Sequence, residues 1–365
     1  MRSRTAQWRQ GWALRWPRPF GAGAHLRVLL VSMDNPISQS QVFPFYLFSH
    51  QWPQRIQLRE VNLDRFLAAP DHAPQGADVV LLQTWIDKSP EQLVALVGLL
   101  RELNPNAKVV YLDSFAPTDL RFAAALNDCV DLYVKKHVLR DRTQYARPTA
   151  GETNLTDFYS RHYGIAEPER VSAIPPSFFS KLIVGPTFFL APYLVHRFHG
   201  HWTGQGLATR RYELHARLGG IGQSDWYQRM RSDAQAAVTA LPSLKTTPVS
   251  YLSKRAYLAE LGQCATCFSP FGYGEVCWRD YEAVAMGAVL IKPDMSHIET
   301  APDIFVPHQT YVPISWTFED LGAAVARVLD HPAEAERISR AAFDVLATYC
   351  REGGFRQHMN QVLAT

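Results

Sequence analysis

The chain has 365 residues, of which 47% are hydrophobic and 19% are charged. This composition excludes collagen-like, fibrous and mostly disordered proteins. The length is more than twice that of a typical domain, so we expect two domains with a ligand-binding cleft between them. Lysine and arginine number 37 against 34 aspartates and glutamates, which gives a formal net charge of +3. From this near balance we expect no nucleic-acid partner, because nucleic-acid binders carry a strongly basic face.

The cysteines are few, odd in number and widely spread. Such a pattern does not build a disulfide framework and favours a reducing compartment, so we predict a cytoplasmic location. Cys264 and Cys267 have the spacing of a zinc-ribbon or redox pair, but no second pair of this spacing follows. We therefore interpret them as small buried side chains of a strand and predict no metal site.

The first 25 residues are rich in arginine and tryptophan and hold no apolar run long enough for a signal peptide. We expect residues 1–25 to form a flexible basic tail. Arginine and tryptophan together also suit an anionic membrane surface, so peripheral contact with the cytoplasmic face of a membrane is a second expectation. A further apolar stretch at 174–198 is interrupted by Lys181 and four prolines, which argues against a membrane-spanning helix.

Residues 26–146 show strands alternating with a helix. Ser89 is placed to cap that helix, with Pro90 in its first turn and Gln92 at the third helical position, and Asn104-Pro105 ends it. Near-continuous apolar strands are typical of a parallel sheet that helices cover on both faces. We therefore predict a doubly wound, Rossmann-like α/β domain over 26–146. The predicted strands are 26–31, 77–83, 108–113 and 130–134.

Periodicity is lost over 147–206, which we expect to be an irregular, aromatic-rich connection. Regular patterning then returns and predicts a second α/β domain over 207–365. Its predicted helices are 226–241, 252–261, 278–286, 318–329 and 333–350, and its predicted strands are 266–270, 288–292 and 310–314.

The segment 268–293 carries the clearest chemical signal. It predicts a strand, a turn containing Gly272 and Gly274, a helix, and a second buried strand. Glycines let the backbone approach a ligand, and the start of the helix presents free N–H groups that attract phosphate. Arg279 and Glu282 lie three residues apart on one face of the helix, where a guanidinium suits phosphate oxygens and a carboxylate suits ribose hydroxyls. The pattern favours a nucleotide site over a solvated surface ion pair.

At these residues the chain resembles the GT-B superfamily of glycosyltransferases. The match to Arg279-x-x-Glu282-Ala, with Gly287 and an apolar strand behind it, is most similar to exostosin-like families. The resemblance implies two Rossmann-like domains facing across a cleft, with Arg279 on the diphosphate and Glu282 on the ribose. Retaining relatives place seven residues between two glutamates, whereas six separate Glu275 from Glu282, so the role of Glu275 and the anomeric outcome stay open.

The resemblance implies transfer of a sugar from a UDP-, GDP- or CMP-linked donor to a glycan or lipid-linked acceptor, without a required cofactor or metal. The domain at 26–146 would hold the acceptor, and the domain at 207–365 the donor. Two alternatives stay open: a non-catalytic sugar-nucleotide-binding subunit, and an epimerase or phosphorylase of the same fold. The predicted donor-binding residues are Gly272, Tyr273, Gly274, Glu275, Arg279, Glu282, Arg217 and Lys292.

Arg217 and Lys292 are the less specific members of this set. Arg217 would present a cation to the donor phosphates or be a surface charge, and Lys292 would face the cleft or extend from a strand end to solvent. The predicted catalytic bases are Asp113 and Asp34, because both follow strands at the edge where ligands of open α/β sheets bind, although either could cap a turn. The basic run 135–142 would hold an anionic acceptor or cover a solvated helix face.

Overall fold

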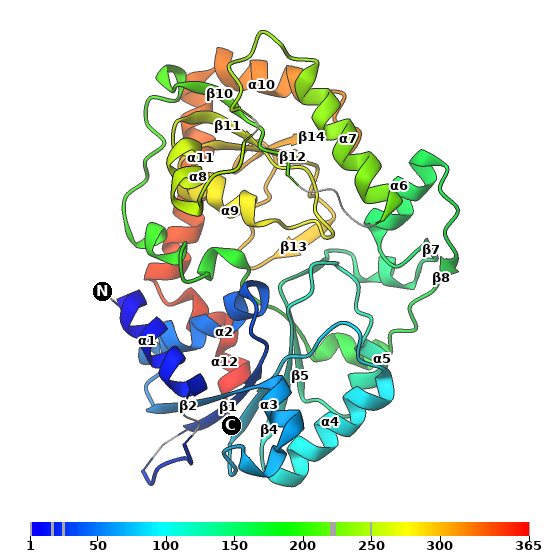
Figure 1. The fold of residues 1–365 in the computed structure, drawn as a ribbon, viewed down its shortest axis with the longest axis vertical. Coiled ribbons are helices and arrows are strands. Elements are labelled where there is room, and N and C mark those ends of the chain that lie inside the picture. The colour runs from blue at the N-terminus through cyan, green and yellow to red at the C-terminus, as the bar shows by residue number, and fades with distance from the viewer. Residues whose placement is uncertain (1, 16–17, 24–25, 220–223, 249, 365) are drawn as a thin grey trace.

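The computed structural model describes residues 2–15, 18–23, 26–219, 224–248 and 250–364. Parts of the expected tail, and the glycine-containing residues 220–223 after Arg217, lie outside the described residues. The chain forms two α/β halves, each built on a parallel sheet that helices cover (Figure 1). The N-terminal half lies below and the C-terminal half above in this view, and the last helix crosses from the upper half to the lower one.

The N-terminal half contains a six-stranded parallel sheet with the order β2-β1-β3-β4-β5-β9. The four strands predicted for 26–146 are confirmed, and each runs through buried apolar residues. Two further strands were missed, the edge strand β2 and the late-joining β9. The strands are β1 (Leu26–Ser32), β2 (Ile56–Asn62), β3 (Val79–Leu82), β4 (Lys108–Asp113), β5 (Leu132–Lys135) and β9 (Leu182–Val184).

Helices cover both faces of this sheet. The predicted cap of α4 is confirmed: Ser89 Oγ accepts from the Gln92 amide at 3.2 Å, and Gln92 Oε1 accepts from the Ser89 amide at 3.0 Å. Helix α2 was missed for two reasons. Pro44 lies inside it, and the helix is buried on nearly all sides, so its sequence lacks the alternation of apolar and polar faces that predicts a helix. The helices are α2 (Pro36–Phe48), α3 (Leu63–Ala68), α4 (Pro90–Leu103) and α5 (Ala123–Leu126).

The start of the chain differs from the expected tail, because residues 2–15 form helix α1 (Arg2–Arg15). Two buried residues on one side of this helix, Ala6 and Gln10, fix it to the N-terminal half. Gln10 Nε2 donates to the buried carboxylate of Glu60 on β2 at 3.2 Å. This hydrogen bond to β2 helps to hold the helix in place, and the composition of residues 1–25 could not predict it.

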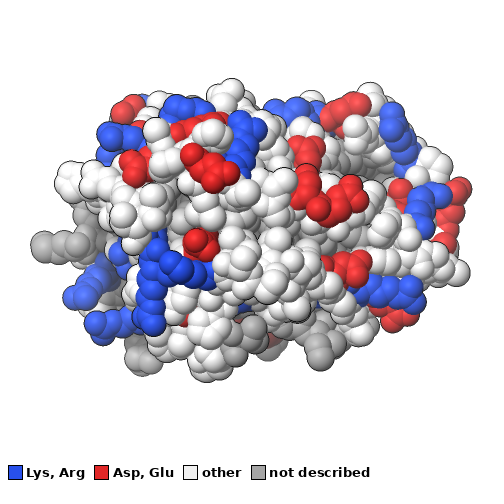
Figure 2. Space-filling model, turned by 90° about the horizontal axis from the view of Figure 1, so that it is seen from above, with Lys and Arg blue, Asp and Glu red and all other residues white. Residues whose placement is uncertain are grey.

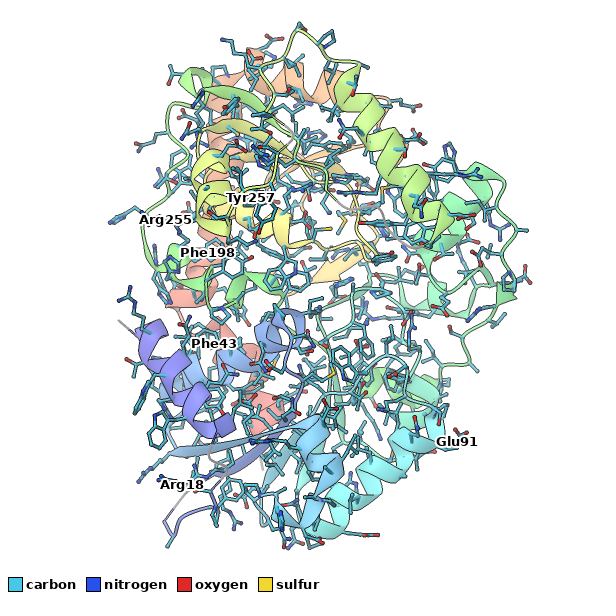
Figure 3. The ribbon with its side chains drawn as sticks, in the orientation of Figure 1. Arg18, Phe43, Glu91, Phe198, Arg255 and Tyr257 are labelled. Carbon is cyan, nitrogen blue, oxygen red and sulfur yellow. The ribbon has the colours of Figure 1, made fainter. Side chains whose placement is uncertain are left out.

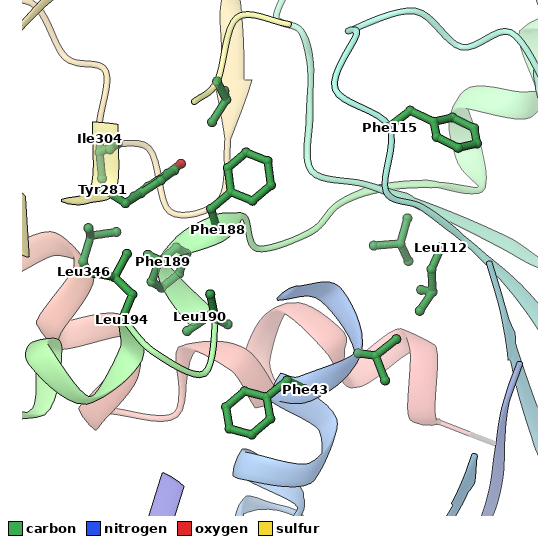
Figure 4. Packing of buried hydrophobic residues seen from close by; sticks show 14 of the residues in the cluster. Phe43, Leu112, Phe115, Phe188, Phe189, Leu190, Leu194, Tyr281, Ile304 and Leu346 are labelled. Carbon is green, nitrogen blue, oxygen red and sulfur yellow. The ribbon is translucent and has the colours of Figure 1, made fainter. Parts of the chain in front are cut away.

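The connection at 147–206 is largely irregular, as expected, but it is not a separate linker. Its strand β9 pairs with β5, and its aromatic residues pack between the two halves. Figure 4 shows Phe188 and Phe189 between Phe43 of the N-terminal half and Tyr281 of the C-terminal half. The apolar core is thus continuous through the connection, which also contains β7 (Thr149–Ala150), α6 (Asn154–Tyr163) and β8 (Glu169–Arg170).

The C-terminal half contains a four-stranded parallel sheet with the order β10-β11-β12-β14. The predicted helices and strands of this half are confirmed, whereas β10, β13 and the last helix α12 were missed. The strands are β10 (Tyr212–His215), β11 (Cys264–Phe268), β12 (Val289–Pro293) and β14 (Val312–Ile314). The helices are α7 (Asp225–Thr239), α8 (Lys254–Leu261), α9 (Trp278–Ala285), α10 (Leu321–Asp330) and α11 (Pro332–Arg351).

Two elements tie the halves together. The last helix, α12 (Gly354–Leu363), packs Phe355 against Phe45 and Phe48 of α2, so this part of 207–365 contacts the N-terminal half. Strand β6 (His137–Leu139) pairs antiparallel with β13 (Ile298–Thr300), which joins the two halves directly. The pairing lies just beyond the carboxyl end of β5, at the edge where parallel α/β sheets bind ligands.

On the face seen in Figure 2, acidic and basic side chains are interspersed, in keeping with the near-neutral net charge. None of the helices in the described ranges combines the length and the apolar character that crossing a membrane requires.

Candidate nucleotide-binding site

A cavity of about 800 Å³ opens at the carboxyl ends of β10 and β11, between α7 and α8. This is the position at which open α/β sheets bind ligands. The cavity, which we call the donor pocket, is lined by charged, tyrosine and glycine residues from five segments of the C-terminal half. Its lining includes Arg217, Leu218, Gly219, Tyr227, Arg231, Ser250, Tyr251, Leu252, Lys254, Tyr257, Ser269, Pro270, Phe271, Gly272, Cys277, Trp278, Arg279 and Glu282.

The glycine turn after β11 lies between this pocket and the N-terminal half. Gly272 lines the pocket, and Tyr273 stacks on Tyr227 of α7 with ring centroids 4.4 Å apart. Gly274 packs against the loop after β4: a Cβ placed on it would lie 1.7 Å from the carbonyl oxygen of Ala116. Only a residue without a side chain fits there, so this close approach explains the glycine and brings the two halves together beside the pocket.

Gly274→Ala should therefore lower the free energy of unfolding by about 1–3 kcal/mol, the usual cost of overpacking, and separate the turn from the N-terminal half. Gly272→Ala is the matched control, because its Cβ would meet nothing nearer than Cys277 Sγ at 3.5 Å, an ordinary contact. Denaturant unfolding of both variants measures the difference. Equal stability of the two would mean that the contact with Ala116 does not constrain the turn.

Two arginines face the donor pocket and have no acidic partner in the part of the chain that the structure describes. The guanidinium of Arg279 donates to the carbonyls of Phe268 and Arg217, and that of Arg231 donates to Gly219 O at 2.8 Å. The Nε of each is buried and has no hydrogen-bond partner among the described residues. Burial lowers the pKa of Arg231, and the nearby charge of Arg279 lowers it further. Two adjacent cations with unused donors make this wall of the pocket attractive to phosphate.

Glu282 supplies a carboxylate at the same pocket. Its side chain is nearly buried, and its Oε1 accepts from Tyr193 OH at 2.6 Å and from Lys254 Nζ at 2.7 Å. Lys254 lies over the rings of Tyr193 and Tyr257. Both contacts use Oε1, so within the described part of the chain Oε2 stays available to accept from a ligand hydroxyl.

Arg217 and Lys292 are held by acidic partners. Arg217 lines the pocket, but its Nη2 donates to Glu260 Oε2 at 2.7 Å, so its charge is compensated within the protein. Lys292 is fully buried beneath the glycine turn, 3.1 Å from Asp280 Oδ1, and does not line the donor pocket. It contacts Ser269 O at 3.4 Å, which supports the backbone from below.

The start of helix α9 differs from the expected open phosphate site. Asp280 occupies the third helical position, and its Oδ2 accepts from the Cys277 amide at 2.8 Å. Its Oδ1 accepts from Ser269 Oγ at 2.6 Å. The carboxylate therefore uses a donor that we expected to be free, and the attraction for phosphate comes mainly from Arg231 and Arg279.

Glu275 lies in the contact between the halves and not in the donor pocket. It is fully buried, accepts from Thr118 Oγ1, and its Oε2 lies 3.5 Å from His137 Nε2 of β6. Burial alone would raise the pKa of Glu275, but the contacts with His137 and Thr118 lower it below its usual value. Burial lowers the pKa of His137 despite the neighbouring carboxylate. At neutral pH a carboxylate thus faces a neutral imidazole, and neither ring nitrogen of His137 has a hydrogen-bond partner in the described ranges.

The two predicted bases occupy different environments. Asp113 is fully buried at the end of β4, where Lys135 Nζ lies 2.8 Å from its Oδ2 and Tyr133 also donates to it. Its Oδ1 accepts from the Phe115 amide at 2.9 Å, and Asp113 does not line the donor pocket. Asp34 is exposed after β1, and within the described residues it has neither a hydrogen bond nor an ion pair.

The basic run 135–142 is not a solvated helix face, because it runs from the last residue of β5 through β6 into the loop that follows. Lys135, Lys136 and His137 are all buried. Arg140 pairs with Asp303 at 2.7 Å, across the junction of the two halves. These cations therefore belong to the internal contact between the halves and do not form an open anionic-acceptor site.

Lys136 makes the stability of the protein depend on pH. Burial, with the nearby charge of Lys135, lowers its pKa from 10.5 to about 7. Between pH 7 and 10 the unfolded chain therefore binds more protons than the folded one, so the free energy of unfolding should rise by up to about 1.4 kcal/mol per pH unit. Below pH 7 this contribution is constant. Denaturant titrations of wild type and Lys136→Met should diverge over that window, and parallel curves would contradict the lowered pKa.

Cys264 and Cys267 are buried in β11, in line with the interpretation as strand residues, and both are free thiols. Within the described ranges, no group of three or more histidine, cysteine, aspartate or glutamate side chains is placed to hold a metal ion.

Sequence reasoning missed Arg231 and Lys254 in the donor pocket and His137 beside Glu275. Tyr227 and Arg231 are four residues apart in a predicted helix, so their shared face could have been noticed. The pairing of His137 with Glu275 has no local signal, because 137 residues separate them and only the packing of the halves brings them together.

Comparison with known proteins finds a fold but no family. Neither a protein-family model nor a curated protein sequence matches the chain. Among solved structures, sucrose-phosphate synthase from Thermosynechococcus elongatus superposes with a TM-score of 0.51 at 12% identity, over 93% of this chain and 98% of that one. The comparison confirms the predicted GT-B fold, with two Rossmann-like halves, and does not show the finer similarity to exostosin-like families.

Two other structures are similar at lower scores. One is an α-glucosyltransferase in complex with UDP and a DNA 13-mer, with a TM-score of 0.49 at 8% identity, covering 93% of this chain and 99% of that one. The other is the pneumococcal O-GlcNAc transferase GtfA with UDP and GlcNAc, with a TM-score of 0.43 at 12% identity, covering 82% and 60%. The DNA complex contradicts our expectation that this protein has no nucleic-acid partner. The near-neutral net charge was not a sufficient reason for that expectation.

Proposed function

We propose that this protein transfers a sugar from a nucleotide-sugar to an acceptor hydroxyl. The observation that carries the proposal is the pair of half-buried arginines, Arg231 and Arg279, at one wall of the donor pocket. Each has a buried Nε without a hydrogen-bond partner, and neither has an acidic partner among the described residues. A diphosphate would satisfy their unused donors, and Glu282 Oε2 would accept from a ribose hydroxyl. The pocket volume of about 800 Å³ falls within the range usual for small-molecule and cofactor sites.

The sugar of the donor would lie toward the contact between the halves, near Glu275 and His137. His137 is neutral at physiological pH, and its Nδ1 is the group that we propose receives the proton of the acceptor hydroxyl, while Glu275 orients the ring. As the bond from the sugar to the diphosphate breaks, Arg231 and Arg279 would stabilise the charge on the departing phosphate. Asp113 would instead position Lys135 and Tyr133 within the N-terminal half.

The test is release of nucleoside diphosphate from UDP-, GDP- and other nucleotide-sugars, measured with the purified full chain, with and without carbohydrate acceptors. We expect release with one class of donor, and faster release when an acceptor is present. Binding of the nucleotide without turnover under any acceptor would favour the non-catalytic alternative. A change of the sugar configuration without release would indicate an epimerase.

A further inference from the structure

Helix α1 presents two large apolar rings to solvent. Trp8 is 64% exposed and Trp12 is 46% exposed, and because they are four residues apart they lie on one face of the helix. Their ring centroids are 5.7 Å apart. The opposite side of the helix is fixed to the protein through Ala6 and Gln10, so the outward direction of the tryptophans is set by the fold. Paired exposed tryptophans usually mark a contact surface.

Four arginines surround these rings. Arg9, Arg18, Arg55 and Arg59 line, with both tryptophans, a shallow hollow of about 350 Å³ between α1 and β2. Within the described part of the chain, none of the four is ion-paired with a carboxylate. Arg59 donates to the carbonyls of residues 18 and 19, and the adjacent Glu60 is buried beneath the helix. We call these six residues the Arg–Trp surface; it carries uncompensated positive charge on a chain of net charge +3.

The arrangement of the rings favours a lipid surface over stacked bases. The guanidinium of Arg18 lies over the ring of Trp12, 5.7 Å from its centroid, and covers a face on which a base would stack. The two tryptophans are tilted by 50° and do not form parallel platforms.

We propose that the Arg–Trp surface seats this protein on an anionic lipid bilayer. Trp8 and Trp12 would enter the headgroup region, where amphipathic rings are favoured, and the arginines would contact lipid phosphates. Arg18 lies at the outer edge of the N-terminal half (Figure 3), so the donor pocket in the other half stays open to solvent. The proposal rests on this surface alone and is independent of the proposed glycosyl transfer.

The test is co-sedimentation of the full chain with phosphatidylcholine vesicles, with and without phosphatidylglycerol. We expect binding only to the anionic vesicles, and added salt should weaken it. Changing Arg9, Arg18 or Arg55 to alanine should lower the affinity for these vesicles by about fivefold for each arginine removed. Trp8→Ala with Trp12→Ala should also release the protein. Trp85→Ala, an exposed tryptophan elsewhere, and Arg337→Ala, an exposed arginine on α11, are the matched controls and should bind as wild type does.

Circular dichroism checks that the variants are folded, which we expect because the changed side chains are exposed. Absence of binding to anionic vesicles overturns the proposal, as does binding that the surface variants leave unchanged. A fluorescently labelled DNA oligonucleotide provides the competing outcome. If the same variants abolish binding to DNA while wild type ignores vesicles, the surface recognises nucleic acid and the lipid proposal is wrong.

Discussion

Changing Arg231 and Arg279 together to alanine should weaken the binding of the donor nucleotide by at least about a hundredfold. Each guanidinium is expected to make a charge-assisted hydrogen bond to the diphosphate, and a bond of this kind contributes about 1.5–3 kcal/mol. Among the described residues neither arginine has an acidic partner, so their removal leaves none of these carboxylates unpaired. Calorimetric titration with the nucleoside diphosphate measures the loss directly.

Arg255→Ala is the matched control for this pair. Arg255 belongs to α8, beside the pocket residue Lys254, but it points away from the ribbon (Figure 3) and does not line the donor pocket. The affinity of the Arg255→Ala variant for the nucleoside diphosphate should equal that of wild type. If the double variant bound the nucleotide as tightly as Arg255→Ala, the two guanidiniums would not be the phosphate site.

Glu275→Gln should reduce the rate of sugar transfer by about a hundredfold or more while changing nucleotide affinity little. The change keeps the shape of the side chain but removes the charge that orients His137, and positioned acid–base groups contribute factors of about 10²–10⁴. Glu275 does not line the donor pocket, so the nucleotide should still bind. Steady-state kinetics with a calorimetric measurement of affinity separates the two effects.

Glu60→Gln is the control for loss of a buried carboxylate. Glu60 is also fully buried, but it lies on the edge strand β2 of the N-terminal half, where it accepts from Gln10 and Ser32. Its change should leave transfer at the level of wild type. Equal rates for Glu275→Gln and wild type would show that the pair Glu275–His137 does not take part in the reaction.

Most of the fold follows from local sequence signals. Buried strands such as β1 and β4 are continuous apolar runs, and α4 has its cap, its proline and its amphipathic face in one segment. The missed elements lack such signals: β2 lies at a sheet edge, and α2 contains Pro44 and is buried nearly all round. Helix α1 looks polar by composition and is held by the tertiary contact of Gln10 with Glu60.

The candidate site was predictable where its residues are local. Arg279 and Glu282 lie on one helix, and both line the pocket. Burial and pairing were not predictable, because they depend on distant partners: Glu260 holds Arg217, Asp280 holds Lys292, and Lys135 holds Asp113. The same holds for Glu275, whose position is set by contact with the N-terminal half.

The most direct test is thermal unfolding of the full chain with UDP, GDP or CMP present in excess. A ligand at a hundred times its dissociation constant stabilises the folded state by about 2.7 kcal/mol, so one of these nucleotides should raise the melting temperature measurably. The increase should disappear when Arg231 and Arg279 are both changed to alanine. An unchanged melting temperature with every nucleotide would contradict a nucleotide-sugar site in the donor pocket.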